Sequence, residues 1–177
     1  ECVDVNTSEV VALKRLRLMH AEDAAFAARF DREIEITRAL GGVPGVVTIL
    51  TSGRHEGRAY YTMRLASEDL HAYIRKKNTE LSPETRARFC EVVVVAVAEA
   101  HDLEMLHRDI SPHNVLVYGT GDGVDLRVSD FGLGKTLGEL QSLTGASIAG
   151  YGSPLYVAPE QRSSLQDASP KSDVFSL

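Results

Sequence analysis

His107-Arg108-Asp109-Ile110-Ser111-Pro112-His113-Asn114 is the segment that says most about the fold. It is followed by Asp130-Phe131-Gly132 and, further along the chain, by Ala158-Pro159-Glu160. A single tripeptide such as Asp-Phe-Gly occurs by chance in a chain of this length about two times in a hundred, so alone it says little. All three motifs in this order leave chance a probability of well under about one in a thousand.

Composition excludes several classes of function. The 177 residues carry a formal net charge of −6 and contain no long basic run, which argues against nucleic acid as a partner. Cys2 and Cys90 lie far apart in the sequence, so buried or free thiols are expected rather than a metal site or a disulfide, as in a reducing cytosol. The longest apolar run, Val92 to Ala98, is too short to cross a bilayer.

Hydrophobic periodicity predicts a strand, a helix and two further strands in the first third of the chain. The first strand covers Val10 to Leu16. Apolar residues at helical spacing between Phe26 and Leu40, followed by Gly41-Gly42, predict an amphipathic helix with a glycine C-cap. Two strands, Val46 to Thr51 and Ala59 to Leu65, are expected on either side of a polar turn at Ser52 to Arg58.

The rest of the chain reads as mainly helical with one hairpin. Leu70 to Ile74 predicts a short helix, and Ser82-Pro83 is a strong start for a long helix that continues to Ala100. The segments Val115 to Tyr118 and Asp125 to Val128 flank a glycine-rich turn and predict a hairpin.

The three motifs resemble those of the eukaryotic-type protein kinase family, more closely its Ser/Thr-specific members. The resemblance implies an α+β, two-lobed fold with a β-rich small lobe and a mainly helical large lobe. Residues 1–64 would be a small lobe without its Gly-rich loop, 65–67 the hinge, and 68–177 a large lobe that stops at the start of its core helix. Such a partial domain is expected to be inactive on its own.

The same resemblance assigns a phosphate-binding pair. Lys14, in Val-Ala-Leu-Lys, would contact the α- and β-phosphates of ATP and be held by a helix carboxylate. Glu33 is the preferred partner, because the residues around it match the family pattern better than those around the competing Glu35. A lone strand lysine is usually just exposed, so this assignment depends on the motifs further along the chain.

The resemblance also assigns the catalytic base and the metal ligands. Asp109 would accept the proton of the attacking hydroxyl. Asn114 and Asp130 are oxygen donors suited to the Mg²⁺ that bridges the ATP phosphates. His107 and Phe131 are expected to be packing elements between the lobes rather than acid or base.

The adenine site is assigned by alignment with the family alone. Ala12 would lie above the ring, Leu116 below it and Met63 at the back. Backbone groups from Arg64 to Ala66 would supply the hydrogen bonds.

Further roles follow from the same family pattern. Asp173 would brace the catalytic loop, and Arg108 would pair with a phosphate added between Asp130 and Glu160. The acceptor hydroxyls in that segment are Thr136, Ser142, Thr144, Ser147 and Ser153. The segment from Gly152 to Glu160 resembles the one that holds a peptide substrate.

These features predict ATP-dependent transfer of the γ-phosphate to a protein Ser or Thr hydroxyl, with ATP and Mg²⁺ as cofactors. A protein substrate, including a second copy phosphorylated in trans, would be the partner, with no nucleic acid and no membrane contact within these residues. A cytoplasmic location is expected, or the cytosolic face of a membrane if an anchor lies outside this sequence.

Two departures from the family pattern leave alternatives open. Ser111 stands where Ser/Thr members usually have Lys, and Thr37 where an apolar residue is usual. A weakly active or inactive kinase-like scaffold is therefore one alternative. A small-molecule kinase is another, disfavoured by the segment that ends at Glu160.

Overall fold

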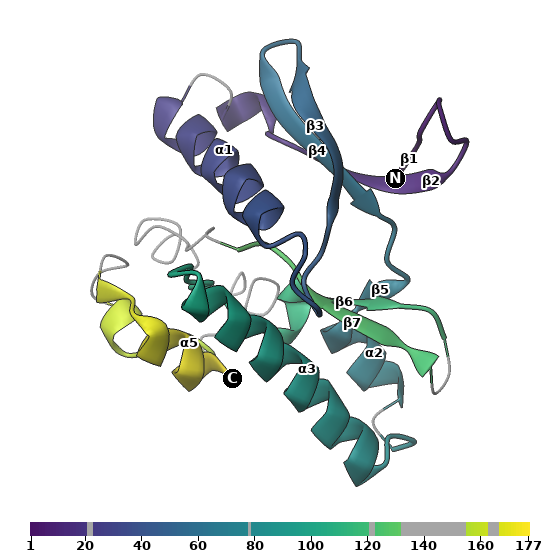
Figure 1. The fold of residues 1–177 in the computed structure, drawn as a ribbon, viewed down its shortest axis with the longest axis vertical. Helices are drawn as coiled ribbons and strands as arrows, with labels where there is room; N and C mark the ends of the chain where they lie inside the picture. The colour runs from purple at the N-terminus through teal and green to yellow at the C-terminus, as the bar shows by residue number, and fades with distance from the viewer. Residues whose placement is uncertain (21–22, 78, 121–122, 132–154, 163–166) are drawn as a thin grey trace.

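The computed structural model describes residues 1–177 except 21–22, 78, 121–122, 132–154 and 163–166. It has two parts, one built on a four-stranded sheet and one that is mainly helical (Figure 1). The α+β architecture predicted from the sequence is therefore confirmed. None of the helices in the described ranges is long and apolar enough to span a membrane.

The first part is an antiparallel sheet with α1 packed beside it (Figure 1). The strand order is β1-β2-β4-β3, and Lys14 on β2 lies opposite Tyr61 on β4. The strands are β1 (Cys2–Val3), β2 (Val10–Arg15), β3 (Ile49–His55) and β4 (Arg58–Arg64).

The predicted boundaries of the β3–β4 hairpin are wrong. The polar stretch taken for a turn is mostly strand, and the turn is the pair Glu56-Gly57, with φ of 50° and 72°. Such left-handed values at both positions match the twist of a tight hairpin. At the other end, Val46 makes a parallel bridge to Val128 instead of starting β3. Polar side chains suit β3 because it is the edge strand of the sheet.

Helix α1 (Ala24–Ala39) begins at the N-cap Asp23, whose carboxylate accepts the N–H groups of Ala25 and Phe26. Its buried face packs Phe30 against Tyr61 of the sheet. The expected glycine C-cap is wrong, because the C-cap is Leu40 with φ of −83°. The Leu40 N–H bonds back to helix carbonyls, so no left-handed residue is needed there.

The second part combines a three-stranded sheet, ordered β5-β6-β7, with three α-helices and two short 3₁₀ helices among the described residues. Its elements are β5 (Glu68–Asp69), α2 (Leu70–Lys77), α3 (Pro83–Asp102), the 3₁₀ helix η2 (Pro112–Asn114), β6 (Val115–Tyr118), β7 (Asp125–Val128), the 3₁₀ helix η5 (Glu160–Arg162) and α5 (Pro170–Ser176). A further 3₁₀ helix, η1 (Leu18–His20), precedes α1. The long helix and the hairpin predicted from the sequence are both present.

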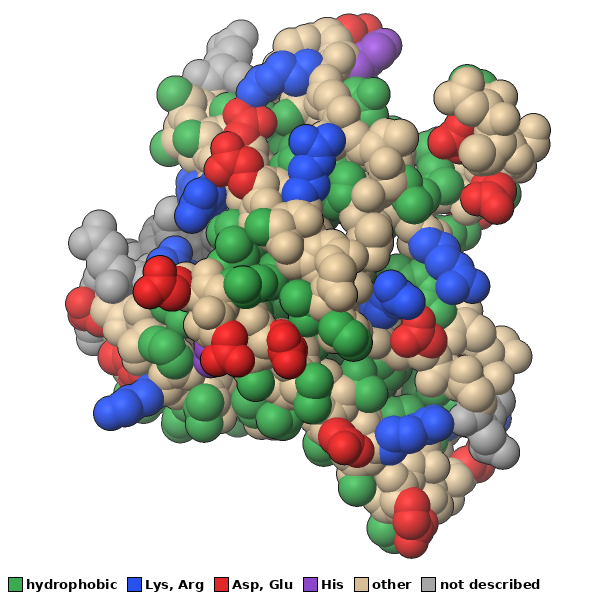
Figure 2. Space-filling model, viewed as in Figure 1, with side chains coloured by type: hydrophobic (Ala, Val, Ile, Leu, Met, Phe, Trp, Pro, Cys, Tyr) green, Lys and Arg blue, Asp and Glu red, His purple; other side chains and the backbone are tan. Residues whose placement is uncertain are grey.

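Helix α3 starts as its sequence predicts, with the Ser82 hydroxyl accepting the Thr85 N–H at 3.2 Å and Pro83 in its first turn. Its β-branched residues have modest helix propensity, so burial of one face must stabilise it. That face packs on β7, whereas Val94 and Val95 point outward. Figure 2 shows hydrophobic side chains over α3 and α5 with charged side chains among them, and charges of both signs over the rest of this face.

The two parts are joined by a packed segment that follows α1. Val128 N–H donates to the Gly45 carbonyl at 2.7 Å, and Val47 N–H donates to the Val128 carbonyl at 3.0 Å. Leu40 from the end of α1 belongs to the same buried cluster as Phe131. The position of α1 is therefore tied to the core of the helical part.

Candidate active site

Three charged side chains from distant segments meet between the two parts. Lys14 Nζ lies 2.6 Å from Glu33 Oε1 and 2.6 Å from Asp130 Oδ1. Lys14 comes from β2, Glu33 from α1, and Asp130 from the segment after β7. Asp130 has φ of 66°, in the left-handed region that non-glycine residues seldom adopt. Strained backbone of this kind is concentrated at functional sites.

Burial and neighbouring charges shift the pKa values of this cluster in opposite directions. Burial lowers the pKa of Lys14, but attraction by Asp130 and Glu33 outweighs it and the pKa is raised. Burial raises the pKa of Glu33, although Lys14 counteracts the shift. Lys14 therefore stays protonated at neutral pH, with one positive charge facing two carboxyl groups.

Glu35, the competing candidate for the lysine partner, lies on the outer face of α1. Its side chain is 67% exposed and pairs with Arg32 at 3.2 Å. Of the two carboxylates considered from the sequence, the structure brings Glu33 to Lys14.

Tyr61 is a member of this cluster that sequence reasoning missed. Its hydroxyl donates to Glu33 Oε1 at 2.6 Å. Burial, followed by the neighbouring carboxylates of Glu33 and Asp130, raises the pKa of the phenol well above its ordinary value, so the group remains a donor. The pairing register of β4 with β2 places this tyrosine opposite Lys14, and no local motif encodes that register.

His107 lies fully buried in the loop between α3 and η2. Its Nε2 is 2.9 Å from the Ser129 carbonyl, and its Nδ1 is 3.2 Å from the Asp109 N–H. A carbonyl only accepts and an N–H only donates, so the ring must be neutral with its proton on Nε2. Burial lowers the pKa of His107 in agreement with this. The ring centroid lies 4.6 Å from that of Phe131, and both side chains are buried.

The backbone of this loop is held by Asp173 of α5. The carboxylate accepts the N–H of His107 at 2.9 Å and that of Arg108 at 2.7 Å. His101, in the last turn of α3, lies 2.8 Å from the same carboxylate. Sequence reasoning missed His101, for which the available signal was a histidine in the last turn of the predicted helix. Arg108 has φ of 69°, so this bracing supports a strained residue next to Asp109.

Asp109 and Asn114 face each other across a short turn. Asn114 Nδ2 donates to the Asp109 carbonyl at 2.6 Å and to Asp109 Oδ2 at 3.1 Å. The Ser129 N–H and hydroxyl both bond the Asn114 carbonyl, at 2.8 Å and 3.1 Å. Ser129, the residue before Asp130, thus ties Asn114 to the segment that carries Asp130.

These residues fit a magnesium ion in part. Because the Asn114 amide nitrogen faces Asp109, its Oδ1 is left to accept or to coordinate, and Asp130 adds carboxylate oxygens. The part of the chain that is described holds no group of three or more His, Cys, Asp or Glu side chains able to bind a metal. A cation here would therefore need further oxygen ligands, such as phosphate oxygens and water.

The residues expected around adenine lie on both sheets. Ala12 on β2 is opposite Met63 on β4, and Leu116 lies on β6 opposite Asp69 of β5. The Arg64 carbonyl already accepts a hydrogen bond of 3.2 Å from the Tyr118 hydroxyl. Residues 65 and 66 form the connector between β4 and the second sheet.

The segment around Ala158-Pro159-Glu160 docks on the same framework. Gln161 Nε2 donates to the Arg108 carbonyl at 2.8 Å, and Glu160 Oε1 accepts the Ser172 hydroxyl at 2.6 Å. Outside the described residues lie Gly132, the stretch from Gly152 to Pro154, and the acceptor hydroxyls of Thr136, Ser142, Thr144, Ser147 and Ser153.

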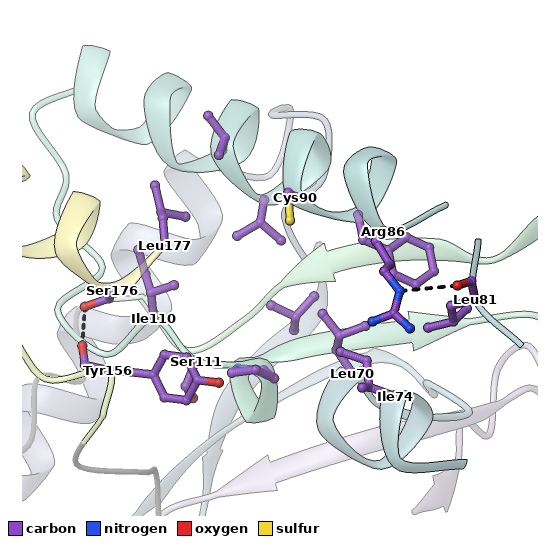
Figure 3. A pocket seen from close by; sticks show the side chains of 15 residues that line it. Leu70, Ile74, Leu81, Arg86, Cys90, Ile110, Ser111, Tyr156, Ser176 and Leu177 are labelled. Atoms are coloured by element: carbon purple, nitrogen blue, oxygen red, sulfur yellow. Dashed lines mark hydrogen bonds between the residues drawn. The ribbon is translucent and has the colours of Figure 1, made fainter. Parts of the chain in front are cut away.

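An apolar pocket of about 310 Å³ lies between α2, α3 and α5 (Figure 3). Ser111 lines it and is only 4% exposed. The position after Ile110 therefore carries a buried hydroxyl instead of the positive charge that the family pattern suggests. Thr37, the other departure, is also fully buried.

Comparison of the sequence with known proteins identifies the family. The family model for the protein kinase domain matches residues 1–177, and the chain belongs to that family. It is 34% identical over 176 residues to the serine/threonine-protein kinase PrkC of Bacillus subtilis, covering 98% of this chain and 26% of that protein. It is 32% identical over 182 residues to the serine/threonine-protein kinase PknA of Mycobacterium tuberculosis, covering 100% of this chain and 41% of that protein. The chain thus spans less than half the length of these relatives.

Proposed function

We propose that the protein to which this chain belongs transfers the γ-phosphate of ATP to a Ser or Thr hydroxyl of a protein substrate. The observation that carries the proposal is the meeting of Lys14, Glu33 and Asp130, whose outer members are 116 residues apart in sequence. Their arrangement supplies one fixed cation next to a carboxylate that could bind a metal ion, as phosphoryl transfer requires. The names of the similar proteins support Ser/Thr rather than Tyr as the acceptor.

Each residue then has a defined task. Asp109, oriented by the Asn114 amide, accepts the proton of the attacking hydroxyl. Lys14, held by Glu33, neutralises the α- and β-phosphates. Asn114 and Asp130 would hold Mg²⁺, which when bound neutralises charge on the phosphate oxygens.

The nucleotide would bind between the two sheets. Ala12, Met63 and Leu116 would enclose the adenine, with backbone groups of residues 64–66 as hydrogen-bond partners. Residues 1–64 then act as the small lobe, 65–67 as the hinge and 68–177 as large-lobe structure. The partner would be a protein substrate, including a second copy phosphorylated in trans. The protein would be located in the cytoplasm or at the cytosolic face of a membrane.

The test uses the full-length protein with ATP labelled at the γ-phosphate, Mg²⁺ and a generic basic protein substrate, followed by phosphoamino-acid analysis. Label on phosphoserine or phosphothreonine is expected, and the variant Asp130→Asn should lose it while remaining folded. Label confined to phosphotyrosine would contradict the acceptor, and label confined to small molecules would favour a small-molecule kinase. Absence of transfer despite ATP binding would favour the scaffold alternative, which the buried hydroxyl of Ser111 makes worth testing.

A further inference from the structure

Tyr61 combines full burial with a short hydrogen bond to a charged group. It lies in the middle of β4, its side chain is 0% exposed, and its hydroxyl donates to Glu33 Oε1 at 2.6 Å. The Lys14 ammonium lies 5.8 Å from the centroid of its ring, and the ring also contacts Phe30 of α1. Tyr61 therefore touches both members of the lysine–glutamate pair and the helix that carries the glutamate.

The charges around Lys14 explain what this hydroxyl adds. One ammonium serves two carboxylates, Glu33 and Asp130, at 2.6 Å each. Glu33 is completely buried, and its Oε2 has no hydrogen-bond partner in the described part of the chain. A buried carboxylate needs donors to stay in place, because it has left water. Lys14 and the Tyr61 hydroxyl are the donors that the structure gives Glu33.

The two donors differ in one respect. Lys14 is shared, and its ammonium must also interact with Asp130 or with a bound phosphate. The Tyr61 hydroxyl comes from a central position of the sheet and has no other recorded acceptor among the described residues. A change of partner by Lys14 therefore leaves the Tyr61 hydroxyl with Glu33 as its acceptor.

We propose that Tyr61 is a positioning residue whose hydroxyl holds the Glu33 carboxylate, and with it α1, in the place from which Glu33 orients Lys14. The effect of Tyr61 on the kinetics rests on the proposed phosphoryl transfer, whereas the effect of Tyr61 on the position of α1 does not. Tyr61 acts only through Glu33, so it need not touch ATP or the protein substrate.

The first experiment compares Tyr61→Phe with wild type in the full-length protein. Phenylalanine keeps the ring and its packing on Phe30 but removes the donor. A hydrogen bond to a charged group accounts for about a tenfold effect or more, so kcat/KM for ATP should fall roughly tenfold through a higher KM for ATP, with the KM for protein substrate unchanged. Partial unfolding would instead lower kcat and leave both KM values as they are.

Tyr60→Phe is the matched control. Tyr60 is the preceding residue of β4, on the opposite face of the sheet by strand alternation, where its hydroxyl lies beside Gly53. The same loss of a hydroxyl there should leave both KM values within twofold of wild type.

The second experiment measures amide hydrogen exchange of residues 30–37 without nucleotide, alone and in the background Glu33→Ala. Tyr61→Phe should speed exchange in α1 roughly tenfold, whereas adding it to Glu33→Ala should change nothing further. An undiminished effect of Tyr61→Phe in the Glu33→Ala background, or exchange within twofold of wild type, would overturn the proposal. If the wild type transfers no phosphate, the proposed function fails, and the exchange result still decides the role of Tyr61.

Discussion

Asp173 and His107 are 66 residues apart in sequence, yet Asp173 Oδ2 accepts the backbone N–H of His107 at 2.9 Å. Its other oxygen accepts the next N–H, that of Arg108, at 2.7 Å. The start of α5 thereby fixes the backbone one residue before Asp109. A carboxylate that is 1% exposed thus sets the position of the proposed catalytic base without contacting it.

The first prediction concerns that brace. Asp173→Ala should lower the free energy of unfolding by about 3 kcal/mol, because one buried and one partly buried N–H group lose their acceptor. Chemical denaturation measures this, with Asp125→Ala as the control, since Asp125 is exposed and pairs with Arg127 at the surface. Equal stability of the two variants would show that the brace is not needed for folding.

The second prediction concerns Thr37, which is 0% exposed and whose hydroxyl has no hydrogen-bond partner among the described residues. Thr37→Val has nearly the same shape and removes the unsatisfied group. It should raise the free energy of unfolding by about 1 kcal/mol. Thr48→Val, at an exposed position, should change stability by less than about 0.5 kcal/mol. A destabilised Thr37→Val variant would mean that the hydroxyl has a partner in the folded protein.

The third prediction concerns the junction between the two parts. A Cβ on Gly45 would lie 3.2 Å from Val92 Cγ1 and 3.3 Å from Ala96 Cβ of α3, at a φ of +76°. Gly57 has a similar φ of +72° with nothing within 4 Å. Gly57→Ala should therefore cost only the backbone strain of about 1 kcal/mol, and Gly45→Ala at least about 2 kcal/mol. Thermal unfolding measures both, and equal losses would exclude tight packing at the junction.

The fourth prediction concerns pH. The folded-state pKa of His107 lies below its ordinary value of 6.5, because burial penalises the charged ring. The unfolded chain therefore binds more protons at acid pH. The contribution of His107 to stability is complete above pH 6.5 and is lost as the pH falls from there through the folded-state pKa, at about 1.4 kcal/mol per pH unit.

Replacement of the ring tests this dependence. His107→Phe should flatten the fall in stability below pH 6.5, measured by denaturation at several pH values. His55→Gln, at an exposed histidine, should keep the wild-type slope. An unchanged slope in His107→Phe would show that His107 does not titrate on unfolding.

Features encoded by short local motifs could be predicted from the sequence, whereas contacts between distant segments could not. The loop at Asp109 and the start of α3 at Ser82-Pro83 were predictable, because short motifs encode them. The β3–β4 turn was misplaced because the polar residues of an edge strand look like loop residues. The hydrogen bond from Tyr61 to Glu33 could not be predicted from the sequence. It joins residues 28 positions apart and depends on how α1 packs against the sheet.

We propose that Asp109 serves as the catalytic base and not as a nucleotide ligand. The most direct measurement compares Asp109→Asn with wild type in the full-length protein, recording ATP affinity and the rate of phosphate transfer separately. We predict an unchanged Kd for ATP within about twofold and a transfer rate lowered at least about a hundredfold, the scale of a lost general base. A transfer rate within about tenfold of wild type would contradict the role of Asp109 as catalytic base.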